Sequence, residues 1–232
     1  MYQNLEMIHS VTHKNSGIKA LESFSYAKEL IHVPLTVAEF YEGCKDYPIV
    51  FIKDQEGTWA SLAILGYQEN HNLFIQENGE WEQGRYIPAY IRRYPFIFIK
   101  QKNSEELSLG IDALCKVDPC TDESMRFFDQ EGKTTPLVKN ALQFLTQFQG
   151  DGKATSEFIK QLDSWELLDE KVATIINPSG EKFHINGFFI VNEEKLKHLS
   201  EKKRNDICKK EAMPLITAHL ISLSNIQRLG LR

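Results

Sequence analysis

The segment Gly84–Lys100, with the sequence GRYIPAYIRRYPFIFIK, constrains the fold more than any other stretch of the chain. It combines several tyrosines with two prolines and an adjacent arginine pair, and it ends in a run of apolar residues. A regular central strand would not carry Pro88 and Pro95, because proline has no backbone N–H to donate to a neighbouring strand. The pattern therefore predicts an irregular, largely buried lead-in that is followed by a core strand from about Phe96 to Ile99.

The rest of the first half is typical of a mixed or antiparallel sheet with little helix. The expected strands are Tyr47–Lys53, Thr58–Tyr67, Leu73–Ile75, Phe96–Lys100 and Leu107–Ile111. The turn residues of Asp54–Gly57 make the first two strands a hairpin. The polar segment Gln101–Glu106 is expected to connect the last two in the same way.

Two short helices are expected before these strands. Ser23–Ile31 has helical potential. Thr36 is a plausible N-cap, and Glu39 stands at the N3 position, as in a capping box. The helix that they begin is expected to stop near Gly43.

The second half is predicted to contain helices and one β-hairpin. Thr135 and Pro136 resemble an N-cap followed by proline at the first helical position. The expected helices are Pro136–Gln149, Thr155–Leu162, Glu193–Leu199, Ile207–Lys210 and an apolar last helix Leu215–Leu229. We expect Gly150-Asp151-Gly152 to end the first of them. Lys171–Ile176 and Phe183–Val191 are expected to form the hairpin.

Composition places the chain among ordinary globular proteins. Of its 232 residues, 42% are hydrophobic and 25% are charged, and the net charge is −5. A protein with this negative net charge lacks the basic character that indicates nucleic-acid binding. The sequence has no apolar run of the roughly 18 residues that a membrane helix needs, and its N-terminus lacks the pattern of a signal peptide. A cytoplasmic α+β protein is therefore expected, with one domain or two closely packed lobes of about residues 1–133 and 134–232.

The motifs that announce common enzymes are absent from the sequence. There is no HExxH, GxSxG, Walker A or GxGxxG pattern. The four cysteines are Cys44, Cys115, Cys120 and Cys208, and no two of them form a CxxC pair. We therefore predict free thiols and no cofactor, although missing motifs do not exclude catalysis.

The first candidates for a binding site are Arg92 and Arg93. One of them is suited to bind a peptide carboxylate, a phosphate or a sugar acid. Alternatively, both pair with acidic neighbours such as Glu39, Glu80 or Glu82 and fix the local structure. In an extended segment adjacent side chains point to opposite faces, so at most one arginine would face a given pocket.

The aromatic residues around the arginines are the second group of candidates. Trp81, Tyr86, Tyr90 and Tyr94 are suited to form a rim for a peptide or a sugar, since such side chains offer a large contact area with little entropy to lose. The alternative is that they are core aromatics whose polar tips have hydrogen-bond partners.

The third pair of candidates, His32 and Glu39, flanks a proline turn. With His71 or His219 they would provide the residue types of a non-haem iron site, but nothing in their spacing selects these residues. Capping by Glu39 and packing of His32 explain both without a metal, so no metal site is predicted. His219 is expected to be a core histidine bonded to a backbone carbonyl or a carboxylate.

Several sequence blocks together resemble the SapC family. The blocks are YPIVFIKD, ILGYQENHNLFIQENGEW, YIPAYIRRYPF, FFDQEGKTTP, LTQFQ, SWELL, NGFFIVNEEKL and AHLISLSNIQRL, and they span the chain from about His32 to Leu229. The family is named for a gene in a bacterial surface-layer locus that also encodes components of surface-layer protein secretion. Relatives are also expected near genes for outer-membrane receptors and for cupin-like and flavin halogenase-like proteins. The resemblance supplies no catalytic residues.

Three functions stay open at this point. The resemblance and the missing motifs favour a non-enzymatic accessory or binding protein for surface-layer or envelope protein export, which holds a polypeptide or anionic ligand in an aromatic groove with an arginine anchor. The alternative is an enzyme or enzyme subunit, metal-dependent or not, that modifies a peptide or glycan. A third is an interaction domain whose apolar last helix helps to build a homodimer.

Overall fold

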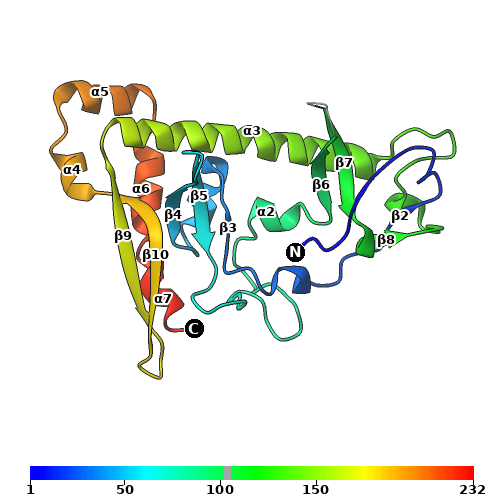
Figure 1. Cartoon of the computed structure of the whole chain (residues 1–232), viewed down its shortest axis with the longest axis horizontal. Helices are drawn as coiled ribbons and strands as arrows, with labels where there is room; N and C mark the ends of the chain where they lie inside the picture. Colours follow the sequence, from blue (N-terminus) through cyan, green and yellow to red (C-terminus); the bar gives the residue numbers. More distant parts are fainter. Residues whose placement is uncertain (102–105) are drawn as a thin grey trace.

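The structure, a computed structural model, describes residues 1–101 and 106–232. The long helix α3 (Pro136–Ser164) runs along one side of the molecule, and two separate sheets lie beneath it (Figure 1). One sheet lies near each end of the helix, and the short helix α2 (Ala89–Arg92) lies between the sheets. The α+β class predicted from the sequence is confirmed.

The larger sheet has five antiparallel strands in the order β3-β5-β4-β10-β9. The strands are β3 (His32–Pro34), β4 (Ile49–Lys53), β5 (Trp59–Ile64), β9 (Leu168–Ile176) and β10 (Lys182–Val191). Both predicted hairpins, β4–β5 and β9–β10, are confirmed. Phe189 of β10 pairs with Phe51 of β4, so strands from the two halves of the chain share one sheet.

The smaller sheets contain the remaining strands. Strands β1 (Leu5–Met7), β7 (Leu107–Asp112) and β6 (Phe96–Lys100) form a three-stranded antiparallel sheet, and β2 (Gly17–Ile18) pairs with β8 (Lys116–Val117). The predicted pairing of β6 with β7 is confirmed. The predicted connection Gln101–Glu106 lies largely outside the described residues.

Short helices fill the connections and the C-terminal part. They are η1 (Ser25–Ala27), η2 (Val37–Glu39), α1 (Phe40–Gly43), η3 (Ala113–Cys115), η4 (Glu123–Met125), α4 (Glu193–Lys197), α5 (Glu201–Lys209), α6 (Met213–Ser222) and α7 (Asn225–Leu229). The capping box of Thr36 and Glu39 is confirmed, and so is the end of α1 at Gly43. None of the helices in the described part of the chain has both the length and the hydropathy needed to cross a bilayer.

Two local predictions are wrong because hydrogen bonds to other segments replace the expected ones. The expected helix Ser23–Ile31 contains only the single turn η1, since the Phe24 N–H donates to the Gly79 carbonyl and the Lys28 carbonyl accepts from a loop N–H. The expected strand Leu73–Ile75 is reduced to one bridge between Ile75 and Trp81.

The apolar last helix is also interrupted. It is two helices, α6 and α7, rather than one. Between them the Ser224 hydroxyl donates to the Ile221 carbonyl, and the Ser222 hydroxyl donates to the His219 carbonyl and accepts from the Ile49 N–H. Serine side chains that bond to the backbone in this way compete with regular helix.

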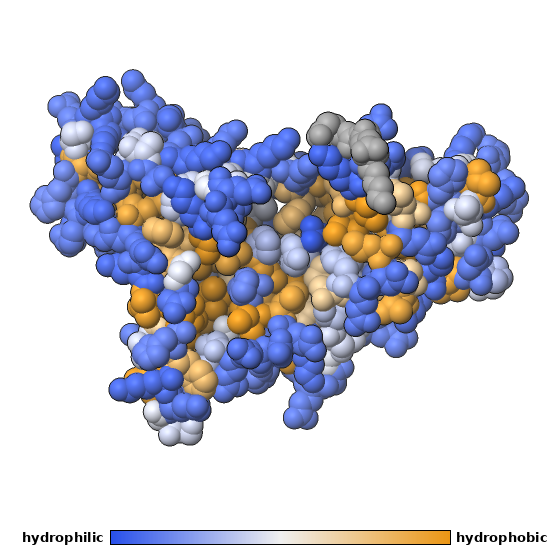
Figure 2. Space-filling model, viewed as in Figure 1, coloured by the Kyte–Doolittle hydropathy of each residue, from blue (hydrophilic) through white to orange (hydrophobic). Residues whose placement is uncertain are grey.

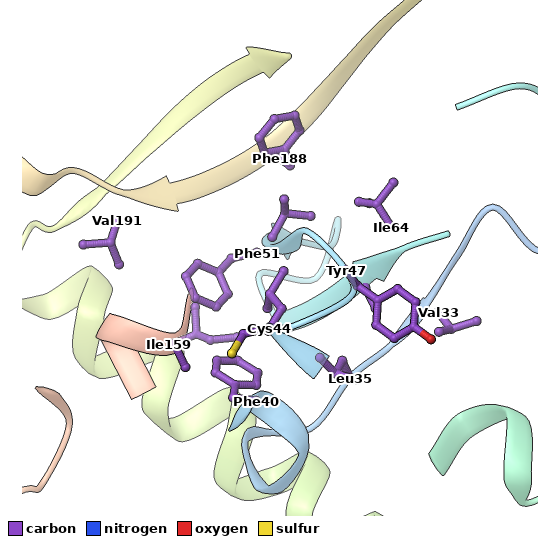
Figure 3. Close-up of a cluster of buried hydrophobic side chains, with 14 of the residues drawn as sticks. Val33, Leu35, Phe40, Cys44, Tyr47, Phe51, Ile64, Ile159, Phe188 and Val191 are labelled. Carbon is purple, nitrogen blue, oxygen red and sulfur yellow. The ribbon is translucent and has the colours of Figure 1, made fainter. Parts of the chain in front are cut away.

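Helix α3 belongs to two hydrophobic clusters at once. Its first part contributes Val138, Ala141 and Leu145 to a cluster under the three-stranded sheet. Its second part contributes Phe158, Ile159 and Leu162 to the larger cluster, which also contains Phe40 of α1, Phe51 of β4 and Phe188 of β10 (Figure 3). The helix therefore anchors both sheets.

The predicted break at Gly150-Asp151-Gly152 is wrong, because α3 is continuous through it. Glycine in a helix costs about 1 kcal/mol relative to alanine, and packing at both ends of the helix offsets this. The Thr155 hydroxyl also donates to the Asp151 carbonyl at 2.6 Å and accepts from the Val37 N–H at 2.9 Å. These bonds hold the glycine-containing turn to η2.

The N-terminal strand depends on the fully buried Asp112. Its carboxylate accepts hydrogen bonds from the backbone N–H groups of Gln3, Asn4 and Leu114 and from the Tyr94 hydroxyl. Burial raises the pKa of Asp112, but these four donors outweigh it and hold the pKa below the ordinary 3.8. The ionised carboxylate thus ties the N-terminus to β7.

Replacing Gly150 with alanine is expected to stabilise the protein by roughly 0.5–1 kcal/mol, because a Cβ at this helical position meets nothing within 4 Å. Urea unfolding measures the change. Gly17→Ala is the contrasting control and should destabilise, since its Cβ would clash with the Met125 carbonyl oxygen. A loss of stability in Gly150→Ala would contradict a continuous α3.

Asp112→Asn is expected to be less stable than the wild type at pH 7. A carboxyl with a lowered native pKa contributes stability above its unfolded pKa and loses it as the pH falls through the native pKa. The difference between wild type and variant should therefore shrink below about pH 3.8. Urea unfolding at pH 7, 5 and 3 tests this, and a difference that does not change with pH would contradict an ionised Asp112.

Candidate functional site

The buried carboxylate of Glu39 positions α2. A one-turn helix is not stable by itself, and Glu39, which is 6% exposed, provides the contact that fixes it. Its Oε1 accepts from the Ala89 N–H at 2.7 Å and from the Tyr86 hydroxyl at 2.9 Å. Its Oε2 accepts from the N–H and the hydroxyl of Thr36 at 3.0 and 2.8 Å. Glu39 thereby joins η2 to the first turn of α2.

Arg92 and Arg93 lie at the end of α2 and not in an extended segment, which corrects the sequence-based geometry. Successive helical residues still point about 100° apart, so the two guanidinium groups meet different partners. Arg92 donates from Nε to the Ile87 carbonyl at 2.9 Å and from Nη2 to the Tyr86 hydroxyl at 3.2 Å. Its guanidinium carbon lies 5.7 Å from the ring centre of Tyr86 and 5.5 Å from that of Phe144.

The Arg93 guanidinium lies among three aromatic rings. Its central carbon is 4.1 Å from the ring centre of Tyr90, 5.7 Å from that of Tyr2 and 5.5 Å from that of Phe148. Its Nε is buried and has no hydrogen-bond partner. A guanidinium over an aromatic face gains roughly 0.5–1 kcal/mol when exposed and about 2 kcal/mol when desolvated, so the three rings help to hold the half-buried Arg93 in place.

Neither arginine is part of an ion pair in the described ranges. The acidic residues that the sequence suggested as ion-pair partners do not pair with these arginines. Glu82 pairs with Arg85 and Arg232, and Glu39 accepts the four hydrogen bonds given above. Arg92 is exposed and Arg93 is half-buried. The positive charge of the pair is therefore not neutralised by a carboxylate in residues 1–101 or 106–232.

We call this region the arginine–aromatic surface. It consists of Tyr2, Tyr86, Tyr90, Arg92, Arg93, Phe144 and Phe148, whose aromatic members are all half-buried. Burial, followed by the Glu39 carboxylate, raises the pKa of Tyr86 to about 12, so its hydroxyl stays a donor at neutral pH. Burial also raises the pKa of Tyr2. The surface thus combines fixed cations with neutral phenols.

The sequence indicated only part of this surface. Of the predicted site residues, Glu39, Tyr86, Tyr90, Arg92 and Arg93 come together. Tyr2, Phe144 and Phe148 were not among the predicted site residues. Phe144 and Phe148 are four residues apart and so share one face of α3. This spacing is the sequence pattern from which the aromatic contribution of α3 could have been predicted.

Trp81 lies elsewhere, whereas the buried Tyr94 borders the surface, since its ring centre is 5.4 Å from that of Tyr2. Trp81 is buried in the larger core, where its ring meets those of Phe74 and Phe24. Tyr94 stacks on Tyr26 with ring centres 4.0 Å apart and forms part of the wall of a separate pocket of about 650 Å³.

The histidines are also dispersed. His32 is exposed on β3, and His71 is exposed in the loop after β5. His219 is a core residue, but its Nε2 accepts from the Val191 N–H at 3.0 Å instead of donating to an oxygen. Burial lowers the pKa of His219 to about 3, so the ring is neutral. No three His, Cys, Asp or Glu residues of the described part are grouped to hold a metal ion.

Figure 2 shows how the two sheets frame this region. Hydrophobic residues gather over β6 and β7 on one side and over the five-stranded sheet on the other, and the face is hollowed below α3 between them. The helix α2, which carries Tyr90 and Arg92 of the arginine–aromatic surface, lies in this interval between the two sheets (Figure 1).

Glu39→Gln is expected to destabilise the protein by roughly 1.5–3 kcal/mol. The substitution replaces one carboxylate oxygen, which accepts two hydrogen bonds, with an amide NH₂ that can only donate. The variant should also release Tyr86 and shift Arg92. Urea unfolding measures the first effect, and the fluorescence of a probe at position 144 reports the second. Glu42→Gln, which breaks only an exposed pair with Lys45, should lose much less. Equal losses in both variants would contradict the positioning role of Glu39.

Comparison with known proteins identifies the family but no close relative. No curated protein and no solved structure matches the chain. The family model described as SapC matches residues 8–229, which is nearly the whole chain, and so confirms the resemblance seen in the sequence blocks. The chain therefore belongs to the SapC family.

Proposed function

We propose that this protein is a non-enzymatic binding protein that holds an acidic polypeptide segment on the arginine–aromatic surface. The observation that carries the proposal is the pair Arg92–Arg93, whose guanidinium groups are fixed by aromatic rings and have no carboxylate partner in the described ranges. Guanidinium groups bind carboxylates in a bidentate manner. A carboxylate of the ligand would thus supply the missing counter-charge.

The half-buried aromatic residues favour a polypeptide over a small anion. Tyrosine and phenylalanine rings that are already held in place lose little entropy when a chain packs on them. They would contact the apolar and aromatic side chains that flank a carboxylate in a peptide. A single inorganic anion would use only the arginines.

The outer face of the three-stranded sheet would extend the contact area. Leu5 and Met7 of β1 are 49% and 46% exposed, although they lie in a sheet. Met7 pairs with Gly110 and Gly110 with Ile97, so these residues share the face opposite the core. An exposed apolar strip of this kind is a common feature of protein interaction sites.

In this proposal the protein is a cytoplasmic accessory for the export or biogenesis of surface-layer or other envelope proteins. Membership of the SapC family supports this context. The broad, open face supports it as well, because a chain in transit to export is unfolded or extended and needs a long surface and not a closed pocket.

Binding to a peptide array tests the ligand class. The array carries twelve-residue segments matched in aromatic content that differ in having Asp/Glu, Asn/Gln or Lys/Arg. The wild type should retain the acidic set, and Arg92→Gln or Arg93→Gln should weaken retention roughly tenfold, as expected for the loss of one charge-assisted bond. Arg204→Gln, which removes an exposed arginine on α5, is the charge-matched control.

Two results would overturn the proposed ligand class. One is equal retention of acidic and neutral segments by the wild type. The other is unchanged retention by both folded variants. If Arg93→Gln does not fold, Arg93→Lys retains the charge and removes the flat stacking group, so weakened retention by that variant still tests the site.

The accessory role needs a separate test. Tagged wild type and Arg92→Gln are used to capture partners from the native cytoplasm, followed by mass spectrometry and by metal and cofactor analysis. A surface-layer or secretion component that binds the wild type and not the variant would support the role. A stoichiometric metal or organic cofactor would contradict a non-enzymatic protein.

A further inference from the structure

A second cationic site lies where α7 meets the loops after α1 and before α2. These segments enclose a pocket of about 520 Å³, which is within the range of small-ligand sites. The ionisable side chains that line it are Lys45, Asp46, Glu82, Arg85, Arg228 and Arg232. Four cations therefore face two carboxylates.

Both carboxylates are already bonded to arginine. Asp46 accepts from Arg85 Nη1 at 2.9 Å and from the Tyr86 N–H at 2.8 Å. Glu82 accepts from Arg85 Nε at 3.0 Å and from both terminal nitrogens of Arg232. The Arg232 hydrogen bond is the main reason why the pKa of Glu82 lies below its ordinary value. These three ion pairs leave Lys45 and Arg228 without a carboxylate partner among the residues that line the pocket.

Arg228 is positioned by a neutral group. Its Nη1 donates to Asn225 Oδ1 at 3.2 Å. Asn225 is 2% exposed, and its Nδ2 donates to the carbonyls of Cys44 at 2.8 Å and Tyr47 at 3.2 Å. A buried amide thus fixes the arginine without neutralising it, and no ion pair to Arg228 forms within the described ranges.

Lys45 is the second cation in excess. Its ammonium pairs with Glu42 at 2.7 Å, but Glu42 is not among the residues that line the pocket, and both side chains are well exposed to water. Such a pair is easily exchanged for another partner. Arg85, with Nε and Nη1 engaged, also has its Nη2 available for a ligand.

We propose that this pocket binds a phosphate-class oxyanion. A phosphate monoester carries close to two negative charges at neutral pH, which matches the two cations that the pocket carboxylates leave unpaired. Arg228 and Arg85 provide directional N–H donors, and Lys45 provides a mobile point charge. The site shares no residue with the arginine–aromatic surface, so it does not rest on the proposed polypeptide function.

Thermal unfolding and isothermal titration calorimetry with inorganic phosphate test the site, with sodium chloride at the same ionic strength as the reference. Phosphate should raise the melting temperature of the wild type above the chloride reference. Arg228→Gln should weaken phosphate binding roughly tenfold or more, because it removes a charge-assisted donor. Arg228→Lys should retain part of the affinity. Arg204→Gln should behave as the wild type.

Several outcomes would overturn the proposal. The first is a wild-type melting temperature that is no higher in phosphate than in the chloride reference. The second is an equal affinity of Arg228→Gln and the wild type for phosphate. The third is an equal rise of the melting temperature in acetate, which would make the pocket a carboxylate site. Arg228 is exposed, so Arg228→Gln is expected to fold. Circular dichroism of the variant checks this. None of these results changes the peptide-array outcome, which depends on Arg92 and Arg93.

Discussion

The continuous helix α3 is the element on which the rest of the structure depends. With 29 residues it is about 43 Å long, and its two ends are buried in different hydrophobic clusters. A rigid rod that anchors two sheets sets the distance between them. The short helix α2 and its arginine pair occupy the interval that this spacing creates (Figure 1). The broad face in Figure 2 is thus a consequence of helix length and not of any single loop.

Local sequence patterns predicted those elements whose partners are close in the chain. The hairpins β4–β5, β6–β7 and β9–β10 and the capping box of Thr36 and Glu39 all follow from signals within about twenty residues. The predicted break in α3 was wrong because the packing that overrides Gly150 and Gly152 comes from residues far away in the sequence. The same applies to Ser23–Ile31, whose backbone groups bond to the loop at Asn72–Gly79. Hydrogen bonds between segments that are distant in the sequence cannot be recognised from a local sequence pattern.

The candidate site shows the same division between local and distant signals. Composition alone drew attention to Arg92, Arg93, Tyr86 and Tyr90, because aromatic residues and arginines are dense there. The contribution of Tyr2 could not be predicted, since it depends on Asp112 binding the N-terminal backbone across more than a hundred residues. The choice between ion-paired and unpaired arginines also required the structure. Glu82, the nearest plausible partner by sequence, is engaged by Arg85 and Arg232 instead.

One chain of hydrogen bonds connects the two cationic regions. Asp46 holds Arg85 of the pocket and the N–H of Tyr86, the Tyr86 hydroxyl donates to Glu39, and Arg92 donates to the same hydroxyl. Asp46 pairs with Arg85 and Glu39 binds backbone and phenol groups, but neither carboxylate neutralises Arg92. The fold therefore uses these acids to position donors, and within the described ranges it leaves Arg92 and Arg228 oriented but without a carboxylate partner. Preorganised donors lose little entropy when an anion binds, which is the physical basis for expecting both regions to bind acidic ligands without a large rearrangement.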